Sequence, residues 1–412
     1  MNAFSWIFLF FLAASVAVQW WLLARQARYV AAHRDRVPEA FAERIPLDAH
    51  HKAADYTLAR ARIQRWELLL SPLVLLAWTL GGGLNRLDGW LAGFGLPALW
   101  HGVALVFLVV LIGALIELPL SIYNTFVIEN RFGFNRMTPG QYLRDLALQA
   151  VLAVVLGAPL VAVMLWLMMR AGDYWWLWAW AVWMGFLLLM LWAFPVLIAP
   201  LFNKFTPLED AELKQRLERL LDRCGFHSNG MFVMDGSKRS SHGNAYFTGF
   251  GRNKRIVFYD TLLKGLTPEE IEAVLAHELG HFKRHHVLIN LAFSALMSLA
   301  GLALLGWLSQ QAWFYHGLGV EHSSPALALV LFLLVTPVFT FFLHPLGAML
   351  SRRHEFQADE FAAQQASARA LISGLVKMYR DNAATLTPDP LYSGFYHSHP
   401  PASIRIRHLQ AL

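Results

Sequence analysis

The chain is short of cysteine and of charge, and each shortage excludes a class of protein. Its single cysteine, Cys224, can form neither an internal disulfide nor a Cys₂ or Cys₄ metal site, so we expect it to be structural. Charged residues make up only 15% of the 412 positions, whereas soluble domains average about 25%. Hydrophobic residues instead reach 57%, and this balance argues against a soluble protein.

Long apolar runs account for the excess of hydrophobic residues. A nearly uncharged stretch of about 18 or more residues can cross a bilayer as a helix. Seven runs of this kind lie at about 4–24, 66–84, 100–122, 147–169, 176–198, 286–308 and 325–348. A large soluble core would not need seven such runs in succession. The sequence therefore predicts an all-α polytopic membrane protein with seven transmembrane helices.

Lysine and arginine are distributed unevenly between the connections. They are frequent after the first, third and fifth runs and scarce after the second, fourth and sixth. Because positive residues collect on the cytoplasmic side, we expect the amino terminus outside and the carboxyl terminus inside. Arg25 and Arg28, directly after the first run, favour an uncleaved helix over a signal peptide. This bias also explains the net charge of +6, so we expect the lipid bilayer, and no nucleic acid, as a partner.

Two stretches are polar enough to lie outside the membrane. They are 199–285 and 349–412, and they alternate with the membrane parts 1–198 and 286–348. Under the predicted topology both polar stretches are cytoplasmic, and we expect them to form a small α+β domain.

The first polar stretch shows helix and strand signals in succession. Leucines at helical spacing predict an amphipathic helix that Gly225 ends. Three extended segments and a turn then predict a small sheet with a hairpin, at 231–234, 244–249, 251–254 and 255–259. Next, Thr267 is placed as an N-cap and Glu270 as its capping-box partner, so a helix begins there.

That helix carries a metal-binding pattern, His277-Glu278-Leu279-Gly280-His281. Residues four apart lie on one helix face, so both imidazoles can reach one ion. Zinc accepts nitrogen and carboxylate ligands, and catalytic sites keep one position for water. Glu278, beside the first ligand, can take a proton from that water. The pattern predicts a catalytic zinc site with Glu278 as general base, although two solvated histidines would also fit the motif taken alone.

A third ligand is predicted after the seventh run. There Glu355 and Asp359 lie four residues apart on one helix face. Glu355 would be the ligand, and Asp359 would orient a ligating imidazole through its free ring nitrogen. From the residues alone Glu360 or His354 could replace Glu355, and an ordinary exposed charged helix is a further alternative. We expect His285 and His286, just beyond the motif, to be interfacial residues.

Several further segments give the chain a family resemblance. The following parts of the chain match segments of one family: Glu129–Arg136, Ile198–Leu208, Lys238–Phe247, Arg352–Asp359, Ser398–Pro401 and Arg405. The chain resembles the membrane metallopeptidases of the Ste24 type, the CAAX prenyl protease 1 family, in their bacterial form. The resemblance implies seven tilted helices around a water-filled chamber that the zinc site faces.

The same resemblance assigns roles to three more residues. It implies that Asn244 and His399 lie near the scissile carbonyl and that Arg405 supports them. A histidine or an asparagine can donate to the oxyanion that develops there, and an edge strand at Asn244 could pair with an extended substrate. The residues alone favour a structural role for both, with His399 as a turn residue and Asn244 as a loop-capping amide.

Together these features predict a membrane zinc endopeptidase, in which 199–285 and 349–412 form a small α+β zincin-like cytoplasmic metallopeptidase domain. Its substrate would be a peptide or protein, either a prenylated CAAX-like one or a misfolded membrane protein. Its location would be the inner membrane of a bacterium, where protein turnover is the more sensible role. One alternative is a transporter or scaffold with a structural zinc, which would need a fourth protein ligand. Another is a four-helix heat-shock type peptidase, against which the seven apolar runs argue.

Overall fold

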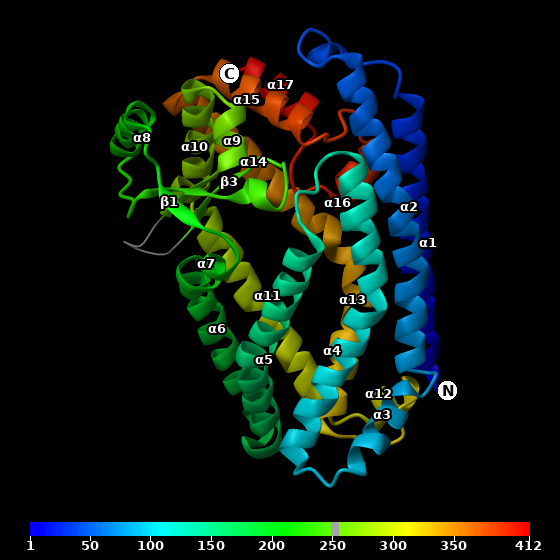
Figure 1. Ribbon diagram of the computed structural model, residues 1–412. Helices are drawn as coiled ribbons and strands as arrows, with labels where there is room; N and C mark the ends of the chain where they lie inside the picture. Colours follow the sequence, from blue (N-terminus) through cyan, green and yellow to red (C-terminus); the bar gives the residue numbers. More distant parts are fainter. Residues whose placement is uncertain (249–254) are drawn as a thin grey trace.

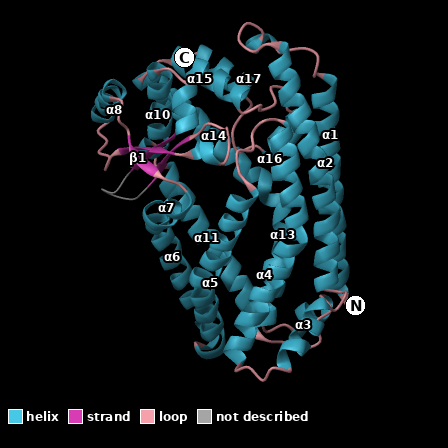
Figure 2. Ribbon diagram, in the orientation of Figure 1, coloured by secondary structure: helices cyan, strands magenta, loops and turns pink. Residues whose placement is uncertain are grey.

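The computed structural model describes residues 1–248 and 255–412, and it is mainly helical. Long helices form most of the molecule, and a small sheet lies to one side at one end of them (Figure 1; Figure 2). The turn expected at 251–254 lies outside the described residues. The predicted fold class, a helical membrane protein with a small α+β part, is confirmed.

Among the described residues, six helical segments are long and apolar enough to cross a membrane, and one bent pair of helices makes a seventh. The six contain α1 (Ala3–Ala32), α4 (Ala98–Tyr123), α5 (Pro139–Arg170), α6 (Trp175–Ala193), α11 (His286–Leu308) and α13 (Pro325–Thr340). The pair is α2 (Leu47–Trp78) and α3 (Gly83–Ala92), bent by 51°. Every apolar run of the sequence therefore falls on one of these spans.

The two ends of the helical part differ. The start of α1 lies at one end with α3 and α12 (Ala312–Gly317), and the sheet and the carboxyl terminus lie at the other (Figure 1). A cavity of about 1060 Å³ is lined by residues of α1, α2, α4 and α13, and it reaches His344. Glu67 and Glu117 are in its wall, so the cavity is partly polar at the level of the membrane helices.

The sheet has four strands in the order β1-β2-β4-β3. They are β1 (Phe205–Pro207), β2 (Met231–Met234), β3 (Ala245–Thr248) and β4 (Arg255–Tyr259). β3 and β4 are antiparallel, as expected for a hairpin, and β1 is antiparallel to β2. The parallel pairing of β2 with β4, and the strand β1, were not predicted. β3 is an edge strand of this sheet.

The remaining helices are mostly shorter, and two of them continue the spans Gly172–Phe202 and Pro325–Gln365. They are α7 (Ala199–Phe202), α8 (Ala211–Arg223), α9 (Asp260–Gly265), α10 (Pro268–Lys283), α14 (His344–Gln365), α15 (Ala368–Asp381), α16 (Pro390–Tyr396) and α17 (Ala402–Gln410). The leucines of α8 are buried, as their spacing predicts, at 213, 217, 220 and 221. They share one core with Cys224, the sheet, α10 and α15. This core packs around α10 and fixes its place relative to the sheet.

Candidate metal centre

The motif helix α10 begins where the sequence predicts. The Glu270 amide donates to Thr267 Oγ1, and the Thr267 amide donates to Glu270 Oε2, which completes the capping box. Helix α14 crosses α10 at Gly280. A Cβ at that position would lie 2.9 Å from the Ala358 Cα and 3.1 Å from its carbonyl oxygen. Only glycine allows so close an approach, and it brings Glu355 against the two motif histidines.

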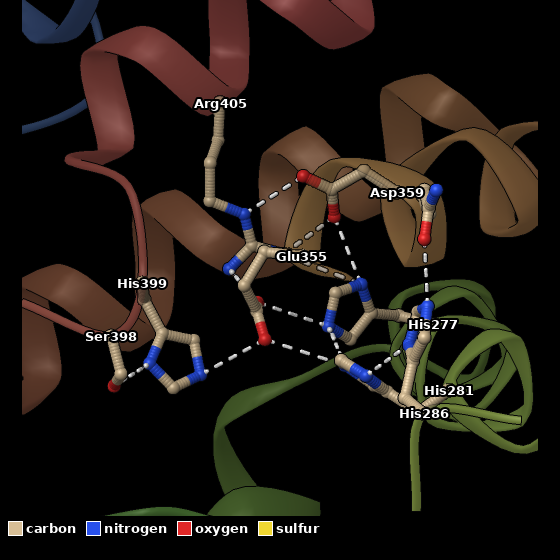
Figure 3. Close-up of polar contacts among 9 residues, drawn as sticks. His277, His281, His286, Glu355, Asp359, Ser398, His399 and Arg405 are labelled. Atoms are coloured by element: carbon tan, nitrogen blue, oxygen red, sulfur yellow. Dashed lines mark hydrogen bonds and ion pairs between the residues drawn. The ribbon is translucent and has the colours of Figure 1, made fainter. Parts of the chain in front are cut away.

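Three donor atoms converge between the two helices (Figure 3). His277 Nε2 and His281 Nε2 lie 3.3 Å apart. Glu355 completes a triangle, with Oε2 at 3.4 Å from His277 Nε2 and Oε1 at 3.3 Å from His281 Nε2. Bonds of about 2.1 Å at tetrahedral angles place donors roughly 3.4 Å apart. The spacing therefore fits one tetrahedral ion, and it is the one such group found among the described residues.

The first histidine is held by a carboxylate and an arginine. His277 Nδ1 lies 2.9 Å from Asp359 Oδ1. Asp359 is fully buried and accepts two hydrogen bonds from the Arg405 guanidinium. Arg405 Nε donates to Asp359 Oδ2 at 2.9 Å, and Arg405 Nη2 donates to Asp359 Oδ1. Arg405 is also buried, and its Nη1 lies 3.5 Å from Glu355 Oε2. This arrangement fixes the His277 proton on Nδ1 and leaves the Nε2 lone pair facing the triangle.

The second histidine is held by residues that the sequence did not reveal. His281 Nδ1 lies 3.1 Å from His286 Nδ1, and His286 Nε2 lies 2.8 Å from Gln357 Oε1. His286 is 2% exposed and stacks on the buried His354. The expectation that His286 is interfacial is therefore wrong. At His285 the backbone has φ +59°, and α11 begins at the next residue with the His286 ring beside His281.

The electrostatics of the triangle favour a cation. With both Nδ1 atoms protonated, two imidazole lone pairs point at a carboxylate, so all three donors are electron-rich. Glu355 Oε2 is buried and has no hydrogen-bond partner among the described residues. Buried polar atoms are normally satisfied, and a metal ion would satisfy this one. The donor set, two imidazoles and one carboxylate, is one that zinc accepts.

Two more groups belong to the site: Glu278, which directly follows the first ligand and feels the charges of the three donor residues, and His399. Glu278 is half-buried, and burial raises the pKa of its carboxyl above the ordinary value. His399 has 61% of its side chain exposed, with Nε2 at 3.4 Å from Glu355 Oε1 (Figure 3). A base with a raised pKa and an accessible imidazole beside three converging donors are the groups that peptide hydrolysis needs.

The remaining predicted residues lie elsewhere. Asn244 is exposed at the start of β3, where its side chain accepts a hydrogen bond from the Ala245 amide. No hydrogen bond joins it to the donor triangle among the described residues. Of the alternative third ligands, Glu360 contacts His408 at 3.5 Å and His354 stacks on His286. The geometry therefore selects Glu355.

The segment before β3 is fastened to the ends of membrane helices. Arg239 donates to both carboxylate oxygens of Asp145 on α5, at 2.8 and 3.0 Å. His242 lies 3.6 Å from Glu129, and Asn382 Oδ1 accepts from the Gly243 amide at 3.0 Å. Segments 129–136 and 238–247, far apart in the sequence, thus meet here and set the place of the edge strand.

Comparison with known proteins covers nearly the whole chain. Residues 26–204 match the family described as CAAX prenyl protease N-terminal, five membrane helices. Residues 207–412 match Peptidase family M48. The junction between the two matches falls within β1, the first strand of the sheet.

Relatives support the same assignment. A CAAX prenyl protease 1 homolog of Arabidopsis thaliana is 41% identical over 71% of this chain and 69% of its own length. CAAX prenyl protease 1 of Saccharomyces cerevisiae is 34% identical over 96% of this chain and 93% of its own. The crystal structure of Ste24p from S. mikatae superposes with a TM-score of 0.92 at 30% identity, covering 99% of both chains.

These matches decide between the functional alternatives. They favour an enzyme over a transporter or scaffold, and the triangle of donors has three protein ligands among the described residues rather than four. The family implies a bound metal and a peptide or protein substrate. The chain therefore belongs to the CAAX prenyl protease 1 family, the membrane metalloendopeptidases of peptidase family M48.

Proposed function

We propose that the chain binds one zinc ion through His277, His281 and Glu355 and hydrolyses peptide bonds beside it. The observation that carries the proposal is the convergence of three donors 3.3–3.4 Å apart around a buried Glu355 oxygen without a hydrogen bond. In such a site zinc supplies a Lewis acid and lowers the pKa of water towards neutrality.

Glu278 is proposed as the general base and then the general acid. Its place in α10 directly follows the first ligand, and the raised pKa of its carboxyl brings it closer to the pH at which it must exchange protons. Glu278 takes the proton of the attacking water and later returns that proton to the leaving amine. Its neighbours Asp359 and Arg405 hold the His277 ring still while this happens.

His399 and Asn244 are proposed to act on the substrate. The exposed His399 imidazole can donate to the carbonyl oxygen as negative charge develops there. Asn244 opens the edge strand β3, which offers unpaired backbone groups to an extended peptide. Arg405 is too buried to touch substrate, so we assign it to positioning through Asp359 and Glu355.

Substrates are proposed to be extended segments of membrane or misfolded proteins. The cavity between α1, α2, α4 and α13 holds about 1060 Å³ and carries both polar and apolar walls, which suits a peptide with mixed side chains. Relatives are named CAAX prenyl proteases, so a prenylated CAAX peptide is the second substrate to test.

Topology is proposed from the charge bias of the connections. The basic connections after the first, third and fifth runs place the sheet, α10 and the carboxyl terminus in the cytoplasm and the amino terminus outside. We propose a bacterial inner membrane as the location. The division into 1–198, 199–285, 286–348 and 349–412 agrees with this arrangement, because two membrane parts alternate with two polar parts.

Cleavage assays with two substrates test the proposal. Detergent-purified wild type and Glu278→Gln are incubated with a prenylated CAAX peptide and with an unprenylated, unstructured polypeptide, and bound zinc is measured in both proteins. Cleavage by wild type alone, with zinc in both proteins, supports the proposal, and the preferred substrate separates CAAX processing from general turnover. Zinc in both proteins and cleavage by neither would contradict it.

A further inference from the structure

Two residues without an assigned role, His286 and Gln357, stand behind the ligand His281. His281 Nδ1 lies 3.1 Å from His286 Nδ1, and His286 Nε2 lies 2.8 Å from Gln357 Oε1 (Figure 3). His286 is the first residue of α11, a membrane helix, and Gln357 is on α14. The contact thus joins the motif helix, a membrane helix and the helix of the third ligand at one point.

We propose that His286 and Gln357 are positioning residues that hold His281 as a metal ligand through a directed chain of hydrogen bonds. The proposal rests on the zinc site proposed above. His286 does not ligate, because its Nδ1 faces the ring nitrogen of His281 that points away from the donor triangle.

The chemistry of the three side chains fixes the direction of the chain. A ligating His281 Nε2 must be bare, so the proton of that neutral ring is on Nδ1. His281 Nδ1–H then donates to His286 Nδ1, which must accept. The proton of neutral His286 is therefore on Nε2 and is donated to the Gln357 carbonyl oxygen. In this arrangement the ring nitrogens that face a neighbour and the Gln357 oxygen each have a hydrogen-bond partner. Reversing either hydrogen bond would move the proton of neutral His281 from Nδ1 to Nε2, the atom that must bind the metal.

Packing keeps His286 in this arrangement. Its ring is 2% exposed and stacks on His354, with centroids 3.9 Å apart and an interplanar angle of 11°. The ring therefore has little freedom to turn away from His281. The two ligands are held differently as a result: His277 by the charged Asp359 and Arg405, and His281 by a neutral imidazole and an amide.

Loss of such a supporting partner typically weakens metal binding by about 10- to 100-fold. His286→Phe keeps a ring to stack on His354 but removes both nitrogens, so we expect zinc affinity to fall within that range. His286→Asn returns a carbonyl oxygen near the place of Nδ1 and should recover most of the affinity. Gln357→Leu should weaken zinc binding, whereas Gln357→Glu keeps an acceptor and should not.

The experiment measures the zinc dissociation constant of the full chain in detergent by competition with a chromophoric chelator. The absorption spectrum of the cobalt-substituted protein serves as a second readout of ligand geometry. His50→Phe is the matched control, because His50 is a buried histidine on α2, 1% exposed, with its Nε2 on the His33 carbonyl. It should leave zinc affinity and cobalt spectrum unchanged.

The expected result is weakened zinc binding and an altered cobalt spectrum in His286→Phe and Gln357→Leu, with recovery in His286→Asn and Gln357→Glu. Wild-type affinity in His286→Phe overturns the inference, and so does equal weakening in His286→Asn and His286→Phe, which would show a packing effect. If His286→Phe does not fold, the Gln357 pair decides in the same way. Failure of wild type itself to bind zinc would instead overturn the proposed function.

Discussion

Replacing Gly280 with alanine tests how the third ligand reaches the motif histidines. The added Cβ would lie 2.9 Å from the Ala358 Cα, 3.1 Å from the Ala358 oxygen and 3.2 Å from the Phe361 Cβ. These atoms are backbone or close to it, so no flexible side chain can move aside. An ordinary carbon–carbon contact is about 3.5 Å or longer, and α14 must therefore retreat from α10 by about 0.6 Å.

That retreat is larger than a metal site tolerates. Glu355 is on α14, one turn before Ala358, so it moves with the helix. Metal–ligand distances vary by only about 0.2 Å in well-formed sites, and we expect Gly280→Ala to lose most of its zinc. The free energy of unfolding should change only modestly. Overpacking costs about 1–3 kcal/mol, and replacing glycine within a helix offsets about 1 kcal/mol of that cost.

A second glycine against the same helix provides the control. Gly374 on α15 also faces α10, but a Cβ there would meet Glu270 and Val274 atoms at 3.5 and 3.7 Å, which is ordinary contact. Gly374→Ala should keep zinc and raise the thermal midpoint. The assay is zinc content after chelator challenge, with thermal unfolding of both variants. Wild-type zinc retention and cleavage by Gly280→Ala would refute the argument that this close approach places Glu355.

Three further predictions concern single side chains. Glu278→Gln should keep its zinc and lose cleavage by about 10²- to 10⁴-fold, because it lacks the general base, as peptide cleavage and metal analysis will show. Asp359→Asn removes the negative charge that faces Arg405 and leaves one acceptor oxygen for Arg405 and His277 together. Unfolding and chelator competition should therefore show a loss of about 3–5 kcal/mol in stability and about 10- to 100-fold weaker zinc binding; unchanged values would contradict the role of this pair. His399→Ala should lower kcat by about 10²- to 10³-fold with unaltered zinc affinity, and a variant with full kcat would remove His399 from the chemistry.

Local sequence patterns predicted the parts of the fold that depend on neighbouring residues. The leucines of α8, the capping box of α10 and the strand β2 each follow from residues within a few positions of one another. The seven spans follow from apolar runs. The parallel pairing of β2 with β4 did not, because it joins residues far apart in the sequence, such as Met231 and Ile256, and no local pattern specifies such a partner.

The candidate site was likewise predicted where it depends on neighbouring residues and missed where it depends on packing between distant ones. Spacing placed His277 and His281 on one helix face, but only the packing of α14 on Gly280 distinguishes Glu355 from Glu360. His286 was missed because its position next to Lys283 and Arg284 suggests an interfacial residue, whereas the left-handed turn at His285 brings it into the interior. A histidine with positive φ has no distinct signal in a single sequence.

Zinc titration of metal-free protein tests the central claim most directly. Wild type stripped by a chelator is titrated with zinc, and cleavage of an unstructured polypeptide is followed at each step, beside Glu278→Gln. We predict no cleavage without zinc, a rise that saturates at one zinc per chain, and the same binding curve without cleavage in Glu278→Gln. Cleavage by the metal-free protein, or equal cleavage by Glu278→Gln, would contradict a zinc peptidase in which Glu278 is the base.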